Sequence, residues 1–391
     1  MSISGVLPDY AGGSILNVVA SVGRHFGVEV AHPGFRGELP LEGAEVVVLV
    51  IADALGHHQL QRHVAEGDAP HLSSLLRSAD ATYTTATSVF PSTTMAAVTS
   101  LHTCAAPSEH GYLGYTVWLE EVASVVNLIT QREILTETPL PDASFLATVP
   151  SLASRLSAEG VSCVATNPAT YEGSFLSSWY LAGVERVLGY RSPATAASLI
   201  GQALPARGRA YATVYWPDYD AVCHQHGPSS RQAADEAASL DLAVGRLVAG
   251  LPRGRSALVL LADHGQLDLP PERVDWPEDE PGFAAAMPSH PGGEARMRYF
   301  RVREGSEALV RERLERSAEV VPAAEAWAGG LFGGPPAREA YRSRVGDLIA
   351  VGRDGGGLGW SYGGTVRHTT AGVHGGWSEA EMRVPVLTVR V

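Results

Sequence analysis

The run Ala44–Ile51 (Ala-Glu-Val-Val-Val-Leu-Val-Ile) is the stretch that most limits how this chain can fold. Its β-branched and aliphatic residues follow one another without polar alternation, which is typical of a strand buried on both faces. Such strands occur in parallel sheets that helices cover on both sides. The run leads directly into Ala52-Asp53-Ala-Leu-Gly56, so a carboxylate follows the strand at once. The sequence therefore predicts a central strand of an α/β sheet with a polar group at its carboxyl end.

Strand-like and helix-like segments alternate along most of the chain. This alternation predicts an α/β fold: a doubly wound, mostly parallel central sheet with helices on both faces. Expected strands lie at 161–165, 210–215, 257–261, 347–351 and 384–391, and expected helices at 15–26, 151–159, 195–203 and 231–249.

The segment 265–371 differs in texture, because proline, glycine and glutamate become frequent and its expected elements are short. We interpret it as a smaller cap-like insertion, since loops that cover a site are a usual place for specificity. Residues 1–40 are interpreted as a peripheral N-terminal lead-in. Residues 41–264 and 372–391 are then expected to form the catalytic core.

Composition excludes several classes of function. The 391 residues carry a net charge of −13, which argues against binding of nucleic-acid polymers, since that requires a basic surface. The three cysteines form no Cys-x-x-Cys pair, so neither a thiolate zinc site nor a disulfide framework is indicated. No apolar run approaches a membrane span and no leader opens the chain, so we expect a cytoplasmic protein without a membrane partner. The oligomeric state has no signal in the sequence.

Acidic and histidine residues follow several of the expected strands. In open α/β sheets, ligands bind beyond the carboxyl ends of the strands, so these side chains are expected to converge. In the motif Asp220-Ala-Val-Cys-His224, the four-residue spacing places both side chains on one face of a helix. Each residue alone could be a helix cap or a solvated side chain; together they indicate metal ligation. The set is Asp53, Asp220, His224, Asp263, His264 and His374.

A loop dense in hydroxyl groups, 84–94, precedes a helix-like run at Met95–His102. A hydroxyl at a helix N-terminus lies where the helix dipole and unpaired N–H groups favour negative charge. That position suits a nucleophile that attacks an anionic group, although serine and threonine are also the ordinary helix caps.

In their order, these motifs resemble the alkaline phosphatase superfamily, and within it the type I phosphodiesterase/nucleotide pyrophosphatase family. The shared pattern is an Asp after the first strand, a hydroxyl nucleophile, Asp-x-x-x-His-x-x-Gly-Pro, Asp-His-Gly and a late His-Gly, and it spans roughly Val46–Trp377. The resemblance implies an alkaline phosphatase-like fold with two divalent metal ions. Zinc suits Asp and His donors best, with manganese or iron as alternatives. The resemblance also implies which residues bind each ion. One ion would be held by Asp53, Asp263, His264 and Thr94. The other would be held by Asp220, His224 and His374, with His226 as the alternative to His224.

The nucleophile is identified by counting within the loop. Matching Phe90-Pro91 to the family's Thr-Phe-Pro would select Val89, which cannot attack phosphorus. The family's downstream Thr-Gly-x-x-Pro-x-x-His-Gly matches the segment 103–111, and the nucleophile lies nine residues before that threonine. The resemblance thus assigns the nucleophile to Thr94, with Thr93 as the alternative.

Two positions depart from the family pattern. Cys104 replaces the usual glycine, and Tyr115 stands where nucleotide pyrophosphatases carry a phosphate-contacting asparagine. We expect the Tyr115 hydroxyl to donate a similar hydrogen bond. Four aromatic residues near the motifs are candidates for stacking on a nucleobase, with core packing as the alternative for each: Phe90, Tyr115, Tyr171 and Trp216.

The charge balance favours a monoanionic substrate. Two dications against three aspartates leave one positive charge, and the nucleophile's alkoxide brings the sum to zero. A phosphomonoester dianion would require an added cation, for which Arg296, Arg298 and Arg367 are available. We therefore expect a metal-dependent hydrolase of phosphodiesters or nucleotide pyrophosphates, acting on a small-molecule phosphate ester, through a phospho-threonine at Thr94. The alternatives are a phosphomonoesterase, a phosphonate hydrolase or a mutase of the same superfamily, or a non-catalytic ligand-binding member.

Overall fold

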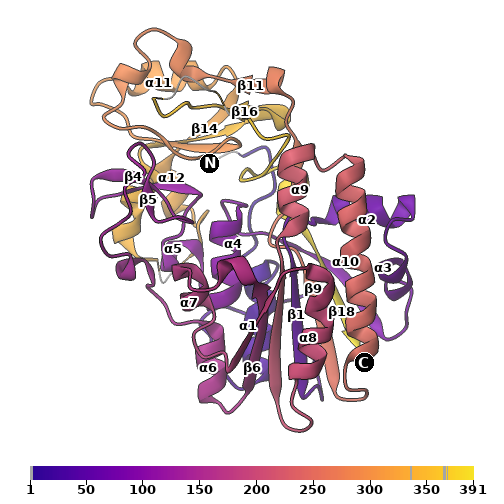
Figure 1. Cartoon of the computed structure of the whole chain (residues 1–391). Helices are drawn as coiled ribbons and strands as arrows, with labels where there is room; N and C mark the ends of the chain where they lie inside the picture. Colours follow the sequence, from indigo (N-terminus) through magenta and orange to yellow (C-terminus); the bar gives the residue numbers. More distant parts are fainter. Residues whose placement is uncertain (1–2, 335–336, 364–366, 368) are drawn as a thin grey trace.

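A computed structural model of the chain describes residues 3–334, 337–363, 367 and 369–391. Its larger sheet confirms the predicted fold class, because helices cover both of its faces (Figure 1). The seven strands of this sheet, in spatial order, are β2 (Ala81–Thr87), β18 (Arg383–Arg390), β9 (Ser256–Leu261), β1 (Val46–Ala52), β8 (Ala210–Trp216), β6 (Ser162–Pro168) and β7 (Arg186–Tyr190).

The predicted parallel character holds for most of the large sheet. β9, β1, β8, β6 and β7 pair in parallel, whereas β18 is antiparallel to both of its neighbours. Every residue of β1 is buried, which is the physical reason for its unbroken apolar sequence. Ala52 pairs with Trp216 of β8, and Ile51 pairs with Leu261 of β9. The carboxyl ends of these three adjacent strands therefore meet at one edge of the sheet.

Two groups of helices flank the large sheet (Figure 1). One group is α1 (Ile15–His25), α4 (Thr94–Thr103), α6 (Leu152–Ala158) and α7 (Phe175–Tyr180); the other is α2 (His57–Glu66), α3 (Pro70–Leu75), α8 (Ala196–Ala203), α9 (Asp218–His226) and α10 (Arg231–Gly250). The expectation of a peripheral lead-in is wrong for α1, because its apolar residues are fully buried in the main core and it packs on α4.

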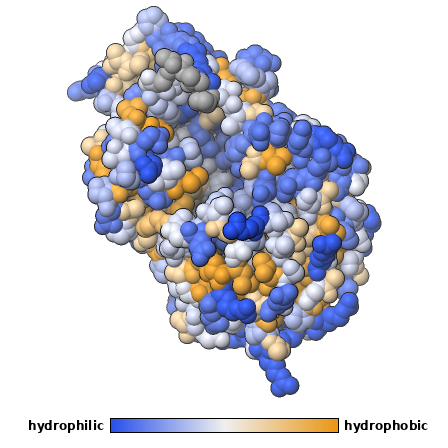
Figure 2. Space-filling view, viewed as in Figure 1, coloured by the Kyte–Doolittle hydropathy of each residue, from blue (hydrophilic) through white to orange (hydrophobic). Residues whose placement is uncertain are grey.

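A second, antiparallel sheet forms the upper part of the molecule in Figure 1. It joins strands from 116–133 to strands from 292–352, so it draws on two separate segments and not on the expected insertion 265–371 alone. Figure 2 shows a hollowed surface where this part meets the part built on the large sheet. Its strands, in spatial order, are β14 (Ala318–Pro322), β15 (Leu348–Gly352), β13 (Met297–Phe300), β12 (Gly292–Glu294), β3 (Thr116–Leu119), β4 (Ser124–Asn127) and β5 (Arg132–Glu133).

Short elements connect the two sheets. The pairing of β10 (Leu267–Asp268) with β17 (Gly372–Val373) holds the segment before His374 beside the loop after β9. β11 (Val274–Asp275) pairs with β16 (Gly357–Leu358). None of the helices in the described residues is both long and apolar enough to cross a membrane. The remaining α-helices are α5 (Pro107–His110), α11 (Glu307–Leu314), α12 (Ala323–Ala328) and α13 (Glu379–Met382).

Candidate metal centre

The first cluster lies at the carboxyl ends of β1 and β9. Asp53 follows β1, Asp263 and His264 follow β9, and one ligand atom from each lies within 4.8 Å of the others. The Nε2 atom of His264 is 3.5 Å from Asp53 Oδ1 and 3.3 Å from Asp263 Oδ2. It is also 3.1 Å from the Oγ1 atom of Thr94, the first residue of α4. The structure thus brings together the four residues expected at one ion.

The donor set of this cluster fits a divalent cation. Asp53 Oδ1 and Asp263 Oδ2 are buried and have no hydrogen-bond partner among the described residues. The opposite oxygens are occupied, since Asp53 Oδ2 accepts a hydrogen bond from Tyr215 and Asp263 Oδ1 accepts one from the Ala54 amide. Burial, together with the nearby carboxylates of Asp263 and Asp220, raises the pKa of Asp53 well above its usual range. Two unpartnered carboxylate oxygens beside an imidazole are costly without a cation, so the cluster could hold a divalent ion.

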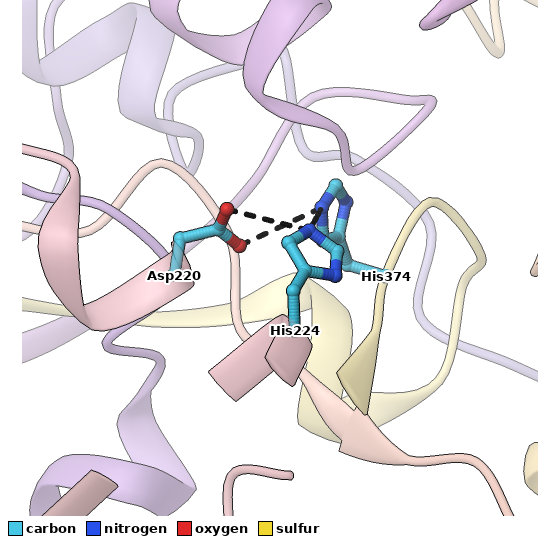
Figure 3. Close-up of side chains that lie close together, drawn as sticks. All are labelled: Asp220, His224 and His374. Carbon is cyan, nitrogen blue, oxygen red and sulfur yellow. Dashed lines mark hydrogen bonds and ion pairs between the residues drawn. The ribbon is translucent and has the colours of Figure 1, made fainter. Parts of the chain in front are cut away.

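The second cluster joins α9 to the loop before β18 (Figure 3). Asp220 and His224 share one face of α9, and their Oδ2 and Nε2 atoms are 3.3 Å apart. His374 completes the group, with its Nε2 atom 3.1 Å from His224 Nε2 and 3.7 Å from Asp220 Oδ1. Burial and the neighbouring histidines lower the pKa of His374 well below its usual value, so its ring is neutral and able to ligate. His226, the alternative to His224, is exposed at the end of α9.

The two clusters are adjacent. The rings of His264 and His374 stack with their centroids 3.9 Å apart, so one histidine of each cluster contacts the other. The Nδ1 atom of His224 lies 2.8 Å from the Gly372 carbonyl, and the Nδ1 atom of His374 lies 3.2 Å from the Ser92 carbonyl. These contacts leave both Nε2 atoms directed at Asp220, as a metal ligand requires.

The hydroxyl loop is fixed from both sides. Ser88 donates a hydrogen bond to the Asp263 carbonyl, and Ser92 donates one of 2.6 Å to the Gly376 carbonyl. Thr93 occupies the N-cap position of α4, and only Thr94 of the two alternatives contacts His264. Cys104 ends α4 in a left-handed conformation with φ of 55°, which explains why a glycine is usual there.

The two expected substrate contacts are placed differently. Phe90 is fully buried and packs between Phe332 and Trp377, so in this structure its ring faces the core. Tyr115 is exposed, and its hydroxyl accepts a 2.7 Å hydrogen bond from Asn127 in β4. The amide of Asn127 therefore lies beside the position at which the family pattern has an asparagine.

Three further polar residues at the site lie outside the sequence motifs. Tyr215, at the end of β8, donates to Asp53, and Gln266 donates a 2.9 Å hydrogen bond to Asp220. Glu294, from β12 of the small sheet, reaches the second cluster, with its Oε2 atom 3.6 Å from His374 Nδ1. Burial raises the pKa of Glu294 to about 8. Tyr215 lies near the end of the strand that precedes Asp220, five residues before it. This position is the signal by which the sequence could have identified Tyr215.

An apolar pocket opens beside Thr94. Its volume is about 160 Å³, and its lining includes the apolar side chains of Met95 and Val98 from α4 and of Leu176 from α7. Tyr215 also lines it, so the pocket adjoins the first cluster. No charged residue is among the described residues that line it, and burial lowers the pKa of His102 there to about 4. The pocket therefore suits an uncharged group.

A buried ion pair holds the loop that carries His374. Arg296, directly before β13, makes two hydrogen bonds of 3.0 and 3.1 Å to the carboxylate of Glu381. Glu381 in turn accepts hydrogen bonds from the Gly376 amide and from Ser378. The small sheet is thereby connected to the loop of the second cluster.

Replacing Arg296 with methionine should destabilise the fold by about 3–5 kcal/mol, because Glu381 would stay buried without its cation. Adding Glu381→Gln should recover part of that loss, since the uncompensated charge is removed. Equilibrium denaturant unfolding measures both. A single variant as stable as the wild type would show that the pair contributes little, as expected for the exposed pair Arg231–Asp235.

The metal-free protein should gain stability from Asp53→Asn. The raised pKa of Asp53 means that the fold favours the neutral carboxyl, so folding stability falls as the pH rises above the ordinary carboxyl value of about 3.9. An amide stays neutral, and after chelation at pH 8 the variant should melt at least about 2 °C higher than the wild type. The difference should shrink toward pH 4. A lower melting temperature of the variant at pH 8 would contradict this explanation.

These features define a class of α/β protein. Two adjacent Asp/His clusters lie at the carboxyl edge of its sheet, and a hydroxyl at a helix N-terminus lies beside both the first cluster and a pocket. The sequence profile of the type I phosphodiesterase / nucleotide pyrophosphatase family matches residues 47–377. The chain belongs to this family, within the alkaline phosphatase superfamily, as predicted. Membership supports a phosphoric ester hydrolase. No curated protein sequence matches the chain.

Solved structures share the fold at low sequence identity. Murine ectonucleotide pyrophosphatase/phosphodiesterase 5, in an inactive form with AMP, superposes with a TM-score of 0.65 at 17% identity, covering 88% of this chain and 87% of that one. Phosphonoacetate hydrolase from Sinorhizobium meliloti, with phosphonoformate, has a TM-score of 0.63 at 18% identity, covering 89% and 91%. At such identities the similarity concerns the fold.

Proposed function

We propose that this protein hydrolyses phosphodiester or nucleotide pyrophosphate bonds with two divalent ions, through a phospho-threonine intermediate at Thr94. The observation that carries the proposal is the position of the Thr94 hydroxyl, 3.1 Å from His264 Nε2 and beside two unpartnered carboxylate oxygens. Zinc is the ion that the Asp and His donors favour, with manganese and iron using the same residues.

The residues divide the work as follows. Asp53, Asp263 and His264 would hold one ion beside Thr94, and Asp220, His224 and His374 would hold the other. Bound ions lower the pKa of a coordinated hydroxyl and neutralise charge on the attacking and leaving oxygens. The Thr94 oxygen forms a bond to phosphorus as the leaving alcohol departs, and water then cleaves the threonine ester.

The start of α4 assists this step. Thr94 is the first helical residue, so the backbone N–H groups of the first turn have no partner within the helix. Together with the helix dipole they favour negative charge at this position. A phosphoryl group on Thr94 would therefore lie where the helix stabilises anionic oxygens.

The arginines support a monoanionic substrate. Arg296 is bound to Glu381, Arg298 donates to the Leu358 carbonyl, and Arg367 pairs with Asp279 at the surface. The three cations that a phosphomonoester dianion could have used are thus engaged elsewhere.

The apolar pocket beside Thr94 would receive the organic group of the substrate. Its lining offers aromatic and aliphatic surface with no charged group among the described residues, so a nucleoside or another uncharged ester group fits it. The structural neighbours were solved with AMP and with phosphonoformate, both small phosphorus-containing ligands. A small phosphate ester, with a nucleotide among the candidates, is therefore the proposed substrate class.

A comparison of bis(p-nitrophenyl) phosphate with p-nitrophenyl phosphate tests the proposal. We expect kcat/KM for the diester to exceed that for the monoester by at least about 10-fold, the ratio that 1.4 kcal/mol of transition-state preference produces. A preference for the monoester would overturn the charge argument and indicate a phosphatase. Hydrolysis of a phosphonate without diester turnover would instead favour a phosphonate hydrolase.

A further inference from the structure

Glu294 lies outside every motif of the family pattern, yet it comes from β12 to contact the second cluster. Its side chain is 15% exposed, and its Oε1 atom is buried without a hydrogen-bond partner among the described residues. Its Oε2 atom is 3.6 Å from His374 Nδ1, the ring nitrogen opposite the one that faces Asp220. A carboxylate in such a position needs an explanation, because burying it without a partner is unfavourable.

The surroundings of Glu294 leave room for its carboxyl group. A Cβ atom on Gly375 would lie 3.0 Å from the Cγ and Cδ atoms of Glu294, and the φ of 112° at Gly375 also favours glycine there. Thr93, the residue before the expected nucleophile, lies against the same carboxyl group. Glu294 therefore contacts both segments that meet at the active site, the hydroxyl loop and the loop that carries His374.

We infer that Glu294 is a positioning residue for the second metal site, which it completes from the small sheet. Its carboxylate and the Ser92 carbonyl together fix the proton of His374 on Nδ1, so that Nε2 presents its lone pair to the ion. Partners of this kind orient a metal-bound histidine and make it more basic. The inference rests on the proposed two-metal function and adds to it a residue that acts through His374.

The charges of the two clusters support this assignment. The first cluster has two carboxylates, Asp53 and Asp263, whereas the second has only Asp220. With Glu294 counted, each cluster has two carboxylates for one dication. Asp220 and Glu294 together therefore offer at the second site the two carboxyl groups that Asp53 and Asp263 offer at the first.

Metal titration of Glu294→Gln tests the inference, because glutamine keeps the size of the side chain and removes its charge. Zinc should be added to chelated protein in competition with a chromophoric chelator, so that the number of ions and each affinity are measured without substrate. We expect two ions in the wild type. In the variant, one ion should bind with unchanged affinity and the other about 10–100-fold more weakly, the usual loss when such a partner is removed.

Two further readouts separate positioning from a general structural role. kcat for a diester should fall in Glu294→Gln and recover at excess zinc, while KM changes little. Glu319→Gln, in β14 of the same small sheet, is the matched control, since its carboxylate pairs with Ser4 away from the clusters, and it should bind both ions as the wild type does.

The possible outcomes distinguish the two proposals. Suppose that the wild type binds two ions. If Glu294→Gln binds both ions with wild-type affinity, or binds both more weakly by the same factor, the role of Glu294 is refuted and the two-metal function stands. If the wild type binds no ion, the proposed function itself fails. Selective weakening of one ion, with unchanged thermal stability of the metal-free variant, supports the inference.

Discussion

Thr94→Ala is expected to lower kcat for a phosphodiester by at least about 10³-fold, because the variant lacks the oxygen that forms the bond to phosphorus. The residual rate would come from water and from the ions. Since the unpartnered oxygens of Asp53 and Asp263 do not depend on Thr94, the variant should still bind two ions per chain. Steady-state kinetics, with metal analysis of the same sample, measures both quantities.

Two matched variants make this prediction specific. Thr94→Ser keeps a hydroxyl at the same position and should retain most of the activity. Thr93→Ala removes the neighbouring hydroxyl, which lies against the Glu294 carboxyl group, and should leave a substantial rate. Full activity of Thr94→Ala with loss of activity in Thr93→Ala would show that the nucleophile is the preceding threonine.

Removing the metal ions should abolish phosphodiester hydrolysis and also destabilise the protein. Without ions, the carboxylates of Asp53 and Asp263, after adjacent strands, and of Asp220, on α9, lie close together, and their repulsion contributes to the raised pKa of Asp53. An ion that binds only the folded state adds about 4 kcal/mol of stability at a thousand times its Kd. The melting temperature of the chelated protein should therefore fall by roughly 5 °C or more, and activity should return with zinc.

The control for chelation is Asp263→Asn, which removes one ligand without a chelator and should lose the ion at the first cluster. Its activity should not return when zinc is added. Full hydrolysis by protein that elemental analysis shows to be metal-free would contradict the assignment of both clusters.

The sequence was informative where a candidate metal-binding side chain comes soon after a strand. The apolar run at 46–51 predicts a buried parallel strand, and the ends of such strands share one edge, so Asp53, Asp220 and Asp263 could be expected to converge. His374 follows from the resemblance and not from any predicted strand, because the two-residue strand before it, β17, gives no signal in the sequence and its pairing with β10 brings His374 back to the site.

Other features depend on contacts between distant segments, which local patterns do not encode. Glu294 ends a three-residue strand with no readable periodicity, and it reaches the clusters only because β12 pairs with β3 and β13. The burial of α1 follows from its packing on α4, since an amphipathic helix near the start of a chain gives no indication of its partner. The engagement of Arg296 with Glu381 likewise appears only in the folded protein.

The stereochemistry at phosphorus tests the central claim most directly. One stereoisomer of a thio-substituted phosphodiester would be hydrolysed in ¹⁸O-labelled water, and the configuration of the product would be determined. Each in-line displacement inverts phosphorus, so the two steps through a Thr94 ester predict overall retention. Overall inversion would mean that water attacks the substrate directly, and it would contradict the phospho-threonine intermediate.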